Sequence, residues 1–332
     1  MNIEEYVNSN FRGCLSVKKH NSTLFEAAYG YADLSNNRRN TLDTKFATAS
    51  AGKVFVAAAI LGLVEEGRLR LDDAIGSILD FDLQNIDPKV TIEELLTHRS
   101  GVPDYFDESI MNDYDELWVD YPNYKIRSSS DLLPLFIKKT MMYPRGEKFQ
   151  YNNSGFVLLG LIIEAISTKK FDAYLKETIF DVAGMKSTGY YELDRLPEKC
   201  ANNYIFDENR SEYYTNIYSV DVKGTGAGGA FTTVKDTECF WNALLSNKLL
   251  SNEMTQRMLS VQSLNPSGNN YGYGIWINEK HNSIVPYFTG SDPGVSFISA
   301  YKLDEDILIT IISNFGDDVW KMMREIQKQL YT

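Results

Sequence analysis

The stretch Ser50-Ala51-Gly52-Lys53-Val54-Phe55-Val56-Ala57-Ala58-Ala59-Ile60-Leu61-Gly62-Leu63-Val64-Glu65-Glu66-Gly67 tells most about the fold of this chain. Its alanine- and leucine-rich composition predicts a helix from Ala51 to Glu66 that ends at Gly67. Because this helix is apolar nearly all round, we expect it to be buried in the core. Ser50 stands where the helix begins, and Lys53 lies one turn further along on the same face.

The pair Ser50 and Lys53 is typical of a serine nucleophile with an activating amine. A serine hydroxyl reacts only when a neighbour takes its proton, and a lysine in an apolar helix can have its pKa lowered enough to help. The Ser-x-x-Lys spacing is weak by itself, because Ser16–Lys19 and Ser167–Lys170 share it. The alternative interpretation is that Ser50 merely caps the helix.

Strand patterns occur towards both ends of the chain, with helical patterns between them. A hairpin is expected at 13–17 and 23–31, and later strands at 273–277, 283–288, 295–301 and 307–313. Helices are expected at 92–98, 130–139, 153–166, 172–181, 234–245 and 317–330. The sequence therefore predicts an α/β (α+β) fold with one mostly antiparallel sheet built from both termini and an inserted helical lobe. A cleft between two such lobes is a usual place for a site.

A second candidate motif is Tyr151-Asn152-Asn153, directly before the apolar helix expected at 153–166. The Tyr151 hydroxyl can shuttle a proton if nearby cations lower its pKa, and the Asn153 amide can hold a substrate carbonyl. The alternative is a buried Tyr151 with Asn153 capping the helix. The loop 102–129 is aromatic and acidic without periodicity, which suits a segment that covers something.

A third candidate motif is Phe288-Thr289-Gly290-Ser291, where a strand runs into the turn Asp292-Pro293-Gly294. Backbone N–H groups along such a strand edge can bind an extended substrate and stabilise an oxyanion. The alternative is an ordinary hairpin with Asp-Pro-Gly as its turn.

Composition excludes several classes of protein. The 332 residues are 43% hydrophobic, which allows a sizeable core, and the formal net charge of −12 argues against a nucleic-acid partner. The three cysteines and three histidines are scattered, so we expect neither a disulfide framework nor a metal site.

Two further patterns in the sequence resemble functional motifs but are interpreted as structural. Gly224-x-Gly226-x-x-Gly229 fits the dinucleotide fingerprint, but Ala230 to Thr233 is unlike the helix that must follow, so no nucleotide cofactor is expected. His98 and Asp104 are interpreted as structural residues of a turn after a helix. The chain also shows no signal-peptide pattern and no apolar run long enough for a membrane span, which favours a cytoplasmic protein.

The three motifs, in this order and spacing, resemble the serine β-lactamase and penicillin-binding protein superfamily, in particular its class C-like branch with esterase-like members. Further similar stretches are Ala28 to Asp33, Leu95 to Pro103, Tyr151 to Phe156 and Tyr271 to Gly274. The resemblance runs from about Gly13 to Phe315. It implies one domain with a three-layer sheet lobe (1–75 and 220–332) and a helical lobe (76–219).

The resemblance also implies roles for individual residues. Ser50 corresponds to the acylated nucleophile and Lys53 to its activator. Tyr151 corresponds to the general base and acid, and Asn153 to the residue that contacts the substrate amide. The backbone N–H groups of Ser50 and Ser291 correspond to the oxyanion hole. No metal or organic cofactor is implied.

The chain departs from the family at Phe288, where a Lys or His usually precedes Thr289-Gly290. That cation helps to bind a substrate carboxylate, and its loss should cost about 1.5–3 kcal/mol, or roughly 10–150-fold in affinity. We therefore expect an acyl-enzyme hydrolase acting on a small ester or amide, with β-lactams and D-amino-acid peptides as further candidates. The alternative is a non-catalytic protein that keeps the pocket to bind or sense a ligand.

Overall fold

The computed structural model describes residues 3–20, 22–111, 114–266, 268–280 and 283–331. His281 and residues 112–113 of the loop 102–129 lie outside the described residues. No helix within these ranges is long and apolar enough to cross a bilayer.

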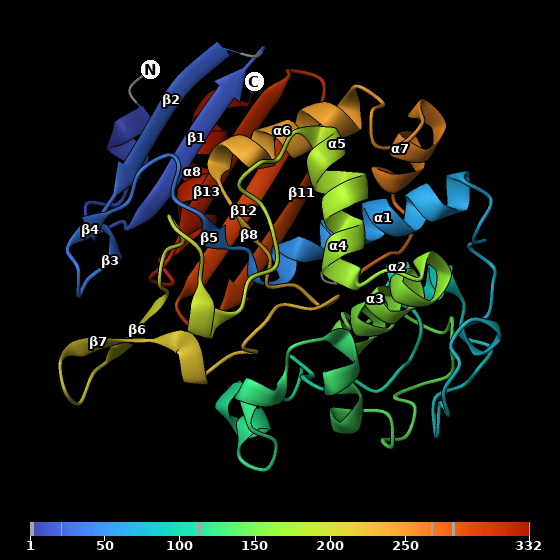
Figure 1. Ribbon diagram of the computed structural model, residues 1–332. Helices are drawn as coiled ribbons and strands as arrows, with labels where there is room; N and C mark the ends of the chain where they lie inside the picture. Colours follow the sequence, from blue (N-terminus) through green and yellow to red (C-terminus); the bar gives the residue numbers. More distant parts are fainter. Residues whose placement is uncertain (1–2, 21, 112–113, 267, 281–282, 332) are drawn as a thin grey trace.

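One seven-stranded antiparallel sheet organises the molecule, in the order β2-β1-β13-β12-β11-β10-β9 (Figure 1). The first strand pairs with the last one, so both ends of the chain build the same sheet, as the sequence predicts. Its strands are β1 Gly13–Lys19, β2 Ser22–Tyr29, β9 Asn270–Tyr271, β10 Trp276–Lys280, β11 Ser283–Asp292, β12 Val295–Lys302 and β13 Ile307–Ser313.

Helices cover both faces of the sheet and make the expected three layers (Figure 1). Helix α8, Val319–Leu330, packs on one face, where every second residue of β13, such as Ile309 and Ile311, points to it. Helices α1, Lys53–Glu65, and α6, Val234–Leu245, lie on the other face. All residues of β12 and β13 are buried as a result.

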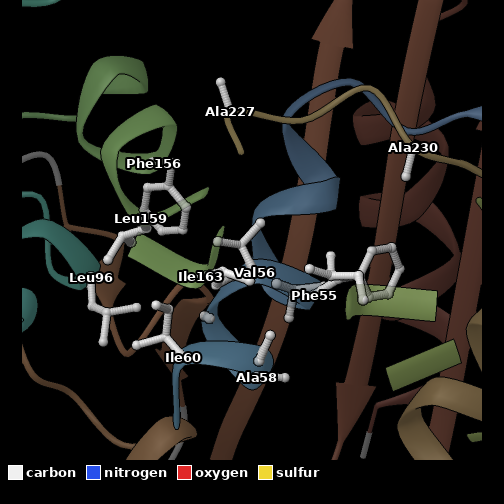
Figure 2. Packing of buried hydrophobic residues seen from close by; sticks show 14 of the residues in the cluster. Phe55, Val56, Ala58, Ile60, Leu96, Phe156, Leu159, Ile163, Ala227 and Ala230 are labelled. Carbon is white, nitrogen blue, oxygen red and sulfur yellow. The ribbon is translucent and has the colours of Figure 1, made fainter. Parts of the chain in front are cut away.

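Helix α1 is the centre of the larger core, because it is apolar on every side. Figure 2 shows Val56 and Ile60 directed towards Leu96 and Ile163 of the helical region, whereas Phe55 points the opposite way. The Phe55 ring meets Phe180 and Phe240 edge to face there. Burying one such side chain contributes about 1.5–3 kcal/mol, so α1 holds the sheet and the helical region together.

The remaining elements are short except for α3, which has 15 residues. The helices are α2 Ile92–Leu96, α3 Asn153–Ser167, α4 Phe171–Leu175, α5 Asp181–Ala183 and α7 Asn252–Met258. The short strands are β3 Tyr31–Asp33, β4 Arg38–Arg39, β5 Phe46–Ala47, β6 Tyr204–Asp207, β7 Glu212–Thr215 and β8 Phe231–Thr232. The β6–β7 hairpin lies in the stretch 76–219, which the sequence pattern describes as helical only.

Two expected helices differ in form. The stretch Ser129–Leu135 is a 3-10 helix, because Pro134 inside it has no N–H to donate to an α-helical ladder. The helix expected at 172–181 is divided into α4, a π-helical turn at Lys176–Phe180, and α5.

Candidate active site

Ser50 lies in a 3-10 turn, Ala49–Gly52, between β5 and α1. The residue before it, Ala49, has a φ of +46°, a left-handed conformation that side chains with a Cβ rarely adopt. Gly52 stands at the N-cap of α1, so Ser50 does not cap that helix. The strained turn instead directs Ser50 to the surface of two cavities.

The Lys53 ammonium is the buried group that joins the two lobes at this point. Its Nζ lies 2.9 Å from Ser50 Oγ, 2.8 Å from Asn153 Oδ1 and within hydrogen-bonding distance of the Ala227 carbonyl. The side chain is 1% exposed. Burial lowers the pKa of Lys53 to about 8, although the nearby carboxylates of Glu108 and Asp104 oppose this. A substantial neutral fraction at physiological pH makes Lys53 able to accept a proton.

The Tyr151 ring lies between Lys53 and two other aromatic rings. Lys53 Nζ is 5.0 Å from the ring centroid, the His98 ring lies tilted against it at 4.4 Å, and Trp276 stacks on it at 5.8 Å. Burial raises the pKa of Tyr151 well above its ordinary value, while a side-chain hydrogen bond with Ser50 acts in the opposite direction. The phenol therefore keeps its proton in the resting site, which favours a donor over a base.

Asn153 is the first residue of α3, and its side-chain amide both accepts and donates a hydrogen bond. Its Oδ1 accepts from Lys53, and its Nδ2 donates to the Phe106 carbonyl at 3.2 Å. The N-cap is Asn152, whose side chain accepts from the Gly155 N–H, so the capping role once open for Asn153 belongs to its neighbour.

His98 and Asp104 hold the start of α3 in place. The Asp104 carboxylate accepts from the backbone N–H groups of Asn153 and Ser154, at 2.8 and 3.0 Å. The Nδ1 atom of His98 accepts from the Asn152 N–H at 3.1 Å, so Nε2 carries the proton of the neutral ring. Both residues position the Tyr151–Asn153 segment, in line with their structural interpretation.

Strand β11 approaches the Ser50 turn so closely that only glycine fits at one position. A Cβ on Gly290 would lie 2.7 Å from the Ser50 nitrogen and 2.2 Å from the Thr48 carbonyl oxygen. Ser291 follows and is exposed at the wall of the wider cavity. The Thr289 hydroxyl accepts from Trp320 Nε1 and donates to the Phe297 carbonyl, so its hydrogen bonds are made within the protein.

Phe288 points away from the site. Its side chain is 2% exposed and packs in an aromatic cluster on the α1 and α6 side of the sheet. The partners are Phe55, Phe240, Trp241 and Phe297, with ring centroids 5.3–6.4 Å away. The sequence predicts that Phe288 contacts the substrate, but the structure places its side chain in the core. An aromatic side chain packed in the core stands where the family usually has a cation.

The glycine-rich stretch 224–229 wraps around the nucleophile turn. The Gly229 N–H donates to the Ala49 carbonyl at 2.9 Å, and a Cβ on Gly228, with a φ of +147°, would collide with that carbonyl. Ala227 supplies the carbonyl that accepts from Lys53. The fingerprint-like glycines thus serve close backbone packing, a role that their spacing alone did not reveal.

Two cavities meet at Ser50. The wider one, about 610 Å³, is bordered by Tyr151, Trp276, Trp320 and the β11 edge 289–293. Its other wall comes from the loop 102–129, through Phe106, Glu108, Met111 and Tyr114, so this loop does line the cleft. The smaller one, about 50 Å³, is lined by Asp221 and Asp292 besides Ser50.

A comparison with known proteins identifies the architecture around this site. The Beta-lactamase family model matches residues 3–327. The chain belongs to the Beta-lactamase family. Among solved members of this fold, a penicillin-binding protein from Bacillus halodurans superposes with a TM-score of 0.93 at 38% identity, covering 99% of this chain and 98% of that chain.

Other relatives of this β-lactamase-family chain are more distant. Penicillin-binding protein 4* of Bacillus subtilis (strain 168) is 27% identical over 326 residues, which cover 93% of this chain and 69% of that relative. D-amino acid amidase from Ochrobactrum anthropi SV3 shares the fold with a TM-score of 0.79 at 21% identity, over 98% of both chains. These similarities confirm the superfamily that the sequence motifs resemble.

Proposed function

We propose that this protein is a serine hydrolase that forms an acyl-enzyme on Ser50 and transfers the acyl group of a small ester or amide to water. The single observation that carries the proposal is the Ser50–Lys53 pair: a part-exposed hydroxyl 2.9 Å from a buried amine whose pKa is lowered to about 8. Burying the charge of a lysine with a structural role only would destabilise the protein, because desolvation of the charge is costly.

In the proposed acylation step, neutral Lys53 takes the Ser50 proton while Oγ attacks the substrate carbonyl carbon. Neutral Nζ would accept from Ser50 and donate its two hydrogens to Asn153 and to the Ala227 carbonyl, which matches the three contacts of this atom. The developing oxyanion would be held by the backbone N–H groups of Ser50 and Ser291, on either side of the close approach at Gly290.

Tyr151 is proposed to carry the proton onward to the leaving group. Its raised pKa favours a protonated phenol, so it donates to the departing amine or alcohol and is recharged from Lys53. This differs from the role of primary base that the family resemblance implies for it. The bond between carbonyl carbon and leaving group then breaks, and water hydrolyses the Ser50 ester by the reverse path.

The substrate class is narrowed by the charges around the cleft. Phe288 supplies no cation for a carboxylate, and Glu108 and Asp292 line the walls. We therefore propose neutral or cationic acyl donors in preference to carboxylate-bearing β-lactams. Relatives named as a D-amino acid amidase and a D-stereospecific amidohydrolase support the inclusion of amides.

The test is covalent labelling followed by intact mass measurement. We expect a fluorophosphonate to add one adduct to the wild type and none to Ser50→Ala, and a fluorescent penicillin to label far more slowly. Wild-type protein that stays unlabelled by both probes would reject the hydrolase and favour the ligand-binding alternative.

A further inference from the structure

The smaller cavity beside Ser50 is acidic and has room for only a small group. Asp221 and Asp292 line it together with Ser50. Its volume of about 50 Å³ exceeds the roughly 10–15 Å³ needed for one water, and so accommodates a head group of a few atoms, not a ring. Tyrosines 105, 114 and 191 complete much of the wall.

One oxygen of the Asp221 carboxylate is buried without a hydrogen-bond partner among the described residues, whereas the carboxylate also has a hydrogen bond with its own backbone. Its Oδ1 atom is sealed from solvent and accepts no hydrogen bond from any residue that the structure describes. A buried carboxylate oxygen left in this state is costly, and most such atoms in proteins are paired. Asp221 therefore indicates a donor that is absent when the cavity is empty.

Asp292 faces the same space from the end of β11, and it also borders the wider cleft. Within the described part of the chain, neither Asp221 nor Asp292 takes part in an ion pair. The Lys53 charge acts on both carboxylates, but the hydrogen bonds of its Nζ go to Ser50, Asn153 and Ala227.

The two carboxylates repel each other's charge. Burial raises the pKa of Asp292 to about 8, helped by the charges of Asp221 and Glu108 and opposed by Lys53. Burial also raises the pKa of Asp221 to about 7. Asp221 and Asp292 are thus substantially protonated near neutral pH, and a ligand cation can replace their protons.

A primary ammonium group fits these features. It carries three N–H donors for the two carboxylates, and its hydrogen bonds to them are charge-assisted. Tyrosine rings in the wall can attract the same cation. Because Ser50 borders both cavities, a substrate whose carbonyl is attacked by Ser50 can extend an ammonium group from the wide cavity into the small one.

We propose that Asp221 and Asp292 form a subsite for a substrate ammonium group, so that the protein acts on aminoacyl esters or amides whose free amine lies on the first or second carbon from the scissile carbonyl. This rests on the proposed hydrolase function of Ser50. The subsite gives binding energy to a cation on the acyl side of the scissile bond.

The kinetic test compares substrates that differ by one amine. Alanine 4-nitroanilide, as each enantiomer, and propanoyl 4-nitroanilide are given to wild type, Asp221→Asn, Asp292→Asn and Asp80→Asn. The last variant removes an equal charge from an exposed site. For wild type and Asp80→Asn, we expect kcat/KM for one alanine enantiomer to exceed kcat/KM for propanoyl 4-nitroanilide by about 10- to 100-fold. In Asp221→Asn and Asp292→Asn this ratio should fall at least tenfold.

A binding test keeps the subsite separate from the chemistry. Alaninamide and propanamide are titrated into Ser50→Ala by calorimetry, with and without Asp221→Asn. Binding of alaninamide alone, abolished by Asp221→Asn, supports the subsite even if no hydrolysis is found. Equal affinity for both amides, or Asp221-dependent binding of Ca²⁺ or Mg²⁺ with none of alaninamide, overturns it. Equal hydrolysis of both anilides by wild type overturns the subsite and leaves the hydrolase standing.

Discussion

The lowered pKa of Lys53 predicts how the reactivity of Ser50 changes with pH. With a pKa of about 8, about one tenth of Lys53 is neutral at pH 7, against about 0.03% at its ordinary value of 10.5. Burial thus raises the fraction of the reactive form roughly 300-fold. Because the neutral amine takes the proton, acylation should accelerate as pH rises and level off above about 8.

The assay is the pseudo-first-order rate of fluorophosphonate labelling between pH 6 and pH 9.5. For wild type we expect a single rising limb with a midpoint near 8. Lys53→Met should label about 10²- to 10⁴-fold more slowly and lose the limb, since general-base assistance is worth about that much. The exposed residue Lys138 provides a matched control, and Lys138→Met should retain the wild-type profile. A profile that is flat, or that still rises at pH 9.5 without levelling, would refute the role given to Lys53.

Three further predictions concern the Tyr151 and β11 walls of the site. Tyr151→Phe should reduce kcat for an anilide by about 10²- to 10⁴-fold but should reduce kcat for a 4-nitrophenyl ester much less, because only the aniline leaving group needs a proton from Tyr151. Equal losses for both substrates would indicate that Tyr151 acts as a base. Gly290→Ala should lower kcat at least about 100-fold with intact substrate binding, as its Cβ would push β11 from Ser50 and spoil the oxyanion hole; an unchanged kcat speaks against that hole. Phe288→Lys should lose at least about 3–5 kcal/mol of unfolding free energy in urea, and a stable variant with new activity on anionic esters would show that this side chain reaches the cleft.

Long apolar patterns made much of the fold predictable. Strand β13 and helix α6 have the bounds expected from the sequence. The strand is buried on both faces and gives a continuous apolar run, whereas the helix is buried along one stripe and gives a helical period. Helix α7 has seven residues and gave no such signal. The 3-10 form of Ser129–Leu135 was not predicted; it follows from Pro134, which lies inside the helix and has no N–H to donate.

The candidate site was predictable only where one segment carries the chemistry. Ser50 and Lys53 are three residues apart, and Tyr151 precedes a clear helix, so the motif order located them. Asp221 gave no signal, because its proximity to Asp292 depends on how a loop and the end of β11 come together beside Ser50. The orientation of Phe288 follows from strand alternation, which places its side chain on the α1 side of β11.

The most direct measurement is rapid acid quenching of a 4-nitrophenyl ester during turnover, followed by peptide mass mapping. The account predicts one acyl group on the peptide that contains Ser50, accumulating before steady state and absent from Ser50→Ala. Turnover of the ester with no acyl group on Ser50, or an equal burst from Ser50→Ala, would contradict the account.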